Sequence, residues 1–81
     1  MYPDEIKQII EAGIKDCTAL IESPDGVHYN AMVISPVFSG KNRVQKQQVV
    51  YATLNTYLAN GSLHAISIKT FTPEEWQTHN G

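Results

Sequence analysis

Apolar residues recur along the first half of the chain with two different spacings, which predict one helix and two strands. Between residues 3 and 13, isoleucines at positions 6, 9 and 10 have the spacing of one helix face. Residues 15–22 alternate apolar and polar side chains like a strand, and a second apolar run follows at 27–35. Between them lies Ser-Pro-Asp-Gly, in which proline fixes one φ angle and glycine accepts a positive one. A β-hairpin is therefore expected.

The second half of the chain predicts a longer helix, a third strand and a short last helix. Residues 43–58 carry apolar side chains at 44, 50, 51, 54, 57 and 58, and Asn60-Gly61 supplies a stop signal. Residues 63–71 alternate as a strand. In Thr72-Pro73-Glu74-Glu75, the threonine and the second glutamate have the spacing of a capping box. A last helix carrying Trp76 is expected to follow.

This order of elements predicts an α+β domain with the pattern αββαβ(α), occupying residues 1–81 as one unit. A strand, helix, strand sequence within one sheet favours a right-handed crossover, which makes the second and third strands parallel. The hairpin makes the first and second strands antiparallel. We therefore expect a mixed three-stranded sheet with the helices packed on one face.

Composition and charge narrow the classes of function. The chain is 42% hydrophobic and 17% charged, and no apolar run approaches the roughly 18 residues needed to span a membrane. The first ten residues lack the pattern of a secretion signal, so a cytoplasmic protein without membrane contact is expected. The net charge of -2 disfavours a general attraction to nucleic acid but allows a local basic patch. The single Cys17 cannot form an internal disulfide.

Two histidines are the main candidates for metal chemistry. His28 and His64 open the second and third predicted strands, and parallel strands begin at the same edge of a sheet, so both are expected on one rim. Each imidazole is either a hydrogen-bonded strand end or a metal ligand, and two are too few to close a tetrahedral site. Cys17 fits a small core position better than a ligand. His79 lies in the C-terminal tail, where no function need be inferred.

Three cations form the other candidate site. Lys41, Arg43 and Lys46 lie in the loop and first turns of the predicted main helix, where they suit either phosphate binding or a solvated surface. Nearby glutamines 45, 47 and 48 carry amides that suit base edges but are also ordinary on a helix surface. The sequence has no nucleotide-binding glycine motif, nucleophile elbow or paired catalytic carboxylates. Nothing in it proposes an enzyme.

The run SPVFSGKNRVQKQQVVYATL, followed by LHAISIKTFTPEEW, resembles the BolA family, and within it the bacterial acid-stress branch. The resemblance covers roughly residues 4–77 and is strongest from Phe38 to Trp76, where the loop glycine, helix, strand histidine and Thr-Pro cap keep the family's order and spacing. It implies a fold similar to class II KH domains. Gly40 is followed by Lys41, Asn42 and Arg43, so the GxxG motif of RNA-clamping KH domains is missing.

The resemblance also implies a function. Members of the family partner monothiol glutaredoxins, and the pair holds a [2Fe-2S] cluster with glutathione, linked to iron-sulfur trafficking or sensing and to stress. The ligand histidine of the family matches His64, and the second ligand, from the hairpin loop or second strand, matches His28. Some members are described as DNA-binding transcriptional regulators, whose loop and helix match Lys41, Arg43 and Lys46. The isolated chain is expected to hold no cofactor and to be a monomer or weak homodimer.

Overall fold

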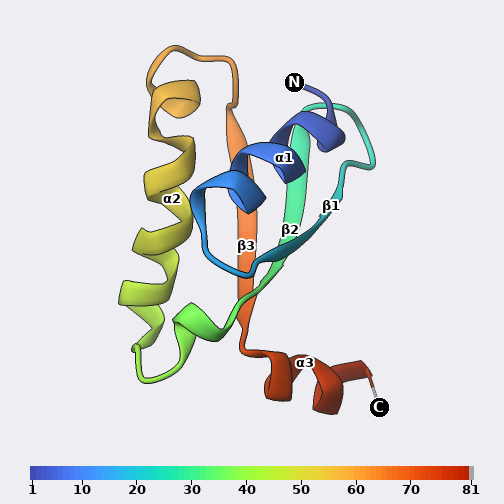
Figure 1. Ribbon diagram of the computed structural model, residues 1–81. Helices are drawn as coiled ribbons and strands as arrows, with labels where there is room; N and C mark the ends of the chain where they lie inside the picture. The colour runs from blue at the N-terminus through green and yellow to red at the C-terminus, as the bar shows by residue number, and fades with distance from the viewer. Residues whose placement is uncertain (81) are drawn as a thin grey trace.

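The predicted order of helices and strands is confirmed by the computed structural model, which describes residues 1–80 (Figure 1). A short 3₁₀ helix, Pro36–Phe38, follows the second strand. The elements are α1 (Pro3–Gly13), β1 (Thr18–Glu22), β2 (His28–Ile34), α2 (Arg43–Ala59), β3 (Ala65–Phe71) and α3 (Pro73–Asn80).

The sheet has the predicted mixed topology. Its strand order is β1-β2-β3, with β1 and β2 antiparallel and β2 and β3 parallel. The hairpin turn contains Gly26 at a φ of 75°, which is the positive angle that its glycine was expected to accept. Figure 1 shows α1 crossing in front of the strands and α2 running beside β3.

The hydrophobic core lies between the sheet and helices α1 and α2. Alternation along the strands directs one set of side chains toward these helices, which meet them with residues spaced three and four positions apart. Phe38 and Leu63, which flank α2, are also buried. The main core side chains are Ile6, Ile10, Ala19, Tyr29, Ala31, Val33, Val50 and Leu54. Within residues 1–80, no helix is both long enough and apolar enough to cross a membrane.

Helices α1 and α2 approach each other closely at Gly13. A Cβ atom placed on Gly13 would lie 2.7 Å from Cγ2 of Thr53 in α2. The following residue, Ile14, is extended with a φ of -129°, so the helix ends without a left-handed cap. Gly13 is therefore required by the helix contact as well as marking the end of α1.

Three local expectations were wrong. The first strand begins at Thr18 rather than at residue 15, because Asp16 adopts a left-handed φ of 51° in a turn. The third strand begins at Ala65 rather than at residue 63. Val44 is 65% exposed and does not join the buried face of α2. Six residues separate it from Val50, which at 3.6 residues per turn places the two about 120° apart around the helix.

Side-chain hydrogen bonds link both outer strands of the sheet to a neighbouring helix. Oε2 of Glu11 accepts hydrogen bonds from Nζ of Lys7 at 2.8 Å and from the backbone N–H of Ala19 at 2.9 Å. Nζ of Lys7 also donates to the Ala19 carbonyl at 2.8 Å. On β3, Nε2 of Gln47 donates to the Ile68 carbonyl at 2.9 Å. These bonds satisfy backbone groups that an edge strand leaves unpaired.

Helix α3 follows β3 with the predicted capping box. The N–H of Thr72 donates to Oε1 of Glu75 at 2.8 Å, and the N–H of Glu75 donates to Oγ1 of Thr72 at 3.2 Å. The backbone N–H of Thr72 lowers the pKa of the Glu75 carboxyl. Trp76 lies edge-on to Phe71 at a ring separation of 5.2 Å and stacks on His79 at 5.4 Å. The aromatic contacts hold α3 against the end of β3.

Candidate functional site

His28 and His64 lie on the same rim of the sheet, as predicted. His28 is the first residue of β2 and pairs in register with Ala65, the first residue of β3, which His64 directly precedes. Given a strand spacing near 4.8 Å, the two histidine Cα atoms are roughly 6 Å apart. Both side chains are exposed. The shared rim is the upper end of β2 and β3 in Figure 1.

Asp25 in the hairpin turn holds His28 through both its ring and its backbone. Oδ2 of Asp25 lies 2.7 Å from Nδ1 of His28. Oδ1 accepts from the backbone N–H groups of Val27 at 2.9 Å and His28 at 2.8 Å. An ionised carboxylate can only accept, so Nδ1 carries the proton and Nε2 is left free. The bond from the His28 ring and those from the backbone hold the pKa of Asp25 well below its usual range.

Ser23 also stabilises this turn, through hydrogen bonds to backbone groups and not to the imidazole. Its Oγ accepts from the N–H of Gly26 at 2.9 Å and donates to the carbonyl of His28 at 2.8 Å. The side chain of His28 is nevertheless 69% exposed. The turn therefore fixes the start of β2 and leaves Nε2 open to solvent and to a partner.

The histidine rim by itself provides only part of a metal site. A [2Fe-2S] cluster takes four protein or thiol ligands, and two imidazoles supply at most two of them. Among residues 1–80, no three His, Cys, Asp or Glu side chains gather in an arrangement that could hold a metal ion. Any cluster bound here needs its remaining ligands from a second molecule.

Cys17 and His79 lie away from this rim. Cys17 precedes Thr18, which pairs with Ile34 at the other end of β2 from His28, about 20 Å along the strand. The Cys17 side chain packs against the core, and this burial, together with the negative charge of Glu11, raises its thiol pKa to about 11. The expectation that Cys17 occupies a core position is thus confirmed only in part, because its side chain packs against the core but is partly buried.

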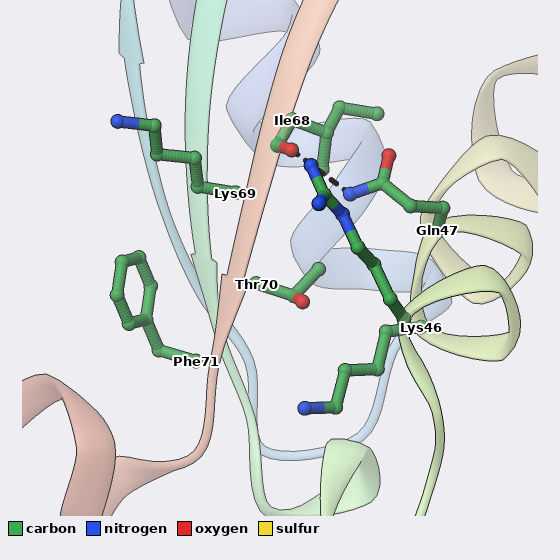
Figure 2. Close-up of a pocket in the computed structure, with 7 residues that line it drawn as sticks. Lys46, Gln47, Ile68, Lys69, Thr70 and Phe71 are labelled. Atoms are coloured by element: carbon green, nitrogen blue, oxygen red, sulfur yellow. Dashed lines mark hydrogen bonds between the residues drawn. The ribbon is translucent and has the colours of Figure 1, made fainter.

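A basic groove lies at the start of α2, where it meets the end of β3. The groove has a volume of ≈ 380 Å³ and is lined by Arg43, Lys46, Gln47, Ile68, Lys69, Thr70 and Phe71. Figure 2 shows Lys46 and Gln47 on one side of β3, and Lys69 and Phe71 on the other. The groove therefore straddles the free edge of β3 and joins Lys69 to two of the three cations chosen from the sequence. Lys41 lies in the turn before the helix and does not line it.

Two of the three glutamines near this groove are engaged within the chain. Gln45 forms a capping box with Asn42, each accepting a bond from the other's backbone N–H at 2.9 to 3.0 Å. Gln47 is bound to the Ile68 carbonyl, as Figure 2 shows. Their amides are therefore used to start the helix and to hold it against β3, which leaves cations as the main chemistry of the groove.

The sequence reasoning did not select Asp25 and Lys69. Asp25 was recognised only as a turn residue, although an Asp two to three residues before an N–H is a common pattern for side-chain capping of a turn. Lys69 alternates with Ile68 in β3, and only the packing of β3 against the start of α2 places it on the lining of the same groove as Arg43 and Lys46.

The histidine rim and the basic groove lie at opposite ends of α2. Arg43 is the first residue of the 17-residue helix, and His64 follows its last turn. At 1.5 Å per residue the helix is about 25 Å long. The two candidate sites are thus separate surfaces on one small domain.

Comparison with known proteins gives consistent matches. The chain matches the family model described as "BolA-like protein" over residues 8–75. It is 46% identical over 54 residues to "Acid stress protein IbaG" of Escherichia coli (strain K12), covering 67% of this chain and 64% of that protein. It is 40% identical over 53 residues to "DNA-binding transcriptional regulator BolA" of Haemophilus influenzae, covering 65% of this chain and 50% of that protein. The structure of a bolA protein homologue from Coxiella burnetii superposes with a TM-score of 0.85 at 33% identity, covering 95% of this chain and 97% of that chain.

Proposed function

Because this chain belongs to the BolA family, we propose that it is a non-enzymatic partner of a monothiol glutaredoxin and shares a [2Fe-2S] cluster with it. The observation that carries this proposal is the pair of exposed imidazoles, His28 and His64, on one rim of the sheet. The relatives named above are a stress protein and a regulator, and neither name is that of an enzyme. Cluster trafficking or sensing in a stress response is the role that is consistent with the names of both relatives.

The chemistry of such a shared site follows from its ligands. The glutaredoxin cysteine and glutathione supply thiolates, while His64 and His28 complete the coordination from this chain. Imidazole in place of thiolate raises the reduction potential of a [2Fe-2S] cluster. It also makes the iron–nitrogen bond sensitive to acid, because a protonated imidazole cannot bind metal. A cluster held in this way is released more readily as the pH falls, which suits the acid-stress name of the Escherichia coli relative.

Coexpression with a monothiol glutaredoxin tests the proposal. The pair is purified without oxygen, and its cluster is followed by visible absorption and circular dichroism, with heterodimer formation measured separately by size-exclusion chromatography. We expect His64→Ala to change or abolish the cluster bands, and His28→Ala to weaken them. His79→Ala is the matched control, since this histidine packs against Trp76 in α3. A cluster spectrum unaffected by His64→Ala contradicts the ligand assignment.

A second candidate function, DNA-binding regulation, is favoured by the basic groove. Arg43, Lys46 and Lys69 surround one groove, and one relative carries the name of a DNA-binding regulator. Three phosphate contacts predict that the logarithm of the affinity falls with the logarithm of salt concentration with a slope of about -2.7. Lys46→Ala is expected to reduce that slope by about 0.9, whereas Lys15→Ala, a cation outside the groove, leaves it unchanged. Absence of duplex binding at low salt excludes this function.

A further inference from the structure

We propose that Asp25 is a positioning residue for His28: it keeps the imidazole proton on Nδ1, so that Nε2 presents its lone pair to the shared cluster. This inference rests on the cluster-sharing function proposed above and identifies a residue outside the ligand set. Asp25 does not itself touch the cluster. Its effect passes through the ring of His28, which it contacts at 2.7 Å.

The geometry favours a positioning role because one carboxylate fixes three groups of the same segment. Its Oδ1 binds the N–H groups of Val27 and His28, which sets the direction in which β2 begins. Its Oδ2 binds Nδ1, which sets both the rotation of the ring and the tautomer. An unrestrained neutral imidazole exchanges its proton between the two nitrogens, and only one tautomer leaves Nε2 able to bind metal.

Carboxylate partners of this kind are general for metal-binding histidines. A ligand histidine commonly donates its other ring N–H to a carboxylate, which orients the ring and makes the metal-binding nitrogen more basic. Loss of such a partner typically costs 10–100-fold in metal affinity. The bond between Asp25 and His28 therefore prepares the free chain for cluster binding before the partner arrives.

The variant Asp25→Asn tests the effect of Asp25 on the tautomer of His28 separately from its effect on the shape of the turn. The asparagine Oδ1 can still accept from the N–H groups of Val27 and His28, so the backbone of the turn is preserved. Its NH₂ group, however, replaces Oδ2 and is a donor facing Nδ1, which favours the opposite tautomer with the proton on Nε2. Ser23→Ala is the matched control, because Ser23 bonds only to the backbone of the turn.

The first experiment uses the isolated chain and needs no cluster. Long-range ¹H–¹⁵N spectra at mildly alkaline pH, where imidazole is neutral, report which nitrogen of His28 carries the proton. We expect Nδ1 to be protonated in the wild type and in Ser23→Ala, and Nε2 in Asp25→Asn. A wild-type ring protonated on Nε2, or a tautomer unchanged by Asp25→Asn, overturns the inference.

The second experiment measures the resistance of the glutaredoxin-bound cluster to an iron chelator, by circular dichroism. We expect Asp25→Asn to lower the chelator concentration for half-loss by 10–100-fold, while Ser23→Ala stays close to wild type. If His28→Ala sensitises the cluster but Asp25→Asn does not, the positioning role is wrong and the proposed function stands. If both turn variants lose the cluster equally, Asp25 only shapes the turn. A wild-type pair without any cluster overturns the proposed function itself, whatever the tautomer.

Discussion

Adding one methyl group at Gly13 is expected to destabilise the protein, and removing one methyl group from Thr53 is expected to reverse that effect. In Gly13→Ala, the new Cβ lies 2.7 Å from Cγ2 and 3.3 Å from Cβ of Thr53. Carbon atoms prefer separations of about 3.5–4.0 Å, so helices α1 and α2 must move apart. Both carry core residues, and the shift is transmitted to the sheet beneath them.

The magnitude is the difference between two opposing effects. Overpacking of this kind typically costs about 1–3 kcal/mol. Alanine is favoured over glycine in a helix by about 0.5–1 kcal/mol, and Gly13, at the end of α1, gains at the lower end of that range. The net loss in the free energy of unfolding is therefore about 0.5–2.5 kcal/mol. In a domain of this size, 1 kcal/mol lowers the melting temperature by about 4–8 °C.

Thr53→Ser provides the background in which the sign changes. Serine lacks Cγ2 but keeps the hydroxyl that donates to the Val50 carbonyl at 2.7 Å. In that background Gly13→Ala loses its severe contact and is expected to be neutral or stabilising by up to about 0.5 kcal/mol. Urea unfolding of the four proteins, followed by far-ultraviolet circular dichroism, gives the coupling energy directly. Equal destabilisation by Gly13→Ala in both backgrounds refutes the steric explanation.

Three further outcomes follow from the ionisable and capping groups. The hydrogen bond from Lys7 lowers the pKa of the Glu11 carboxyl below its usual value of 4.5. The stability that the ionised carboxylate contributes is therefore present above pH 4.5 and is lost as the pH falls through the folded-state pKa. The difference in unfolding free energy between wild type and Glu11→Gln should close on acidification, and a constant difference contradicts this. Because the pKa of Cys17 is raised from 9.0 to about 11, alkylation at pH 8 should be about 100-fold slower in the folded chain than in urea, as measured by mass spectrometry. Thr72→Ala removes one half of the capping box and should cost α3 about 1 kcal/mol, seen as faster hydrogen exchange in α3 with α1 unchanged; uniform acceleration throughout the chain speaks against a local cap.

Most of the fold could be predicted because its signals are local. The apolar spacing in α1, the Pro-Asp-Gly turn and the Thr72 capping box are each written within a few residues, and each formed as expected. The start of β1 was missed because the left-handed turn at Asp16 uses a residue without the usual glycine signal. The exposure of Val44 was missed because Val44 was counted with the apolar face of α2, although it lies about 120° around the helix from Val50.

The candidate site was predictable only in part, for a physical reason. The shared rim followed from topology, since parallel strands joined by a crossover begin at one edge. The bond between Asp25 and His28 depends on the course of the turn backbone, and the position of Lys69 depends on how β3 packs against α2. Neither is encoded in the spacing of residue types. The sequence therefore indicated the candidate ligands, and the structure added the neighbouring residues Asp25 and Lys69.

The placement of the two histidines on neighbouring parallel strands has a consequence for how the protein matures. His28 belongs to the hairpin, a local unit of the kind that forms within microseconds. His64 reaches the rim only after the whole of α2 has been laid down as a crossover, and such non-local pairing is the slower part of folding. A partly folded chain therefore has at most one of the two imidazoles in place at the rim. Under the cluster-sharing function proposed above, a chain that has left the pairing of β2 with β3 incomplete lacks the shared rim, so we expect cluster loading only in molecules that have finished folding.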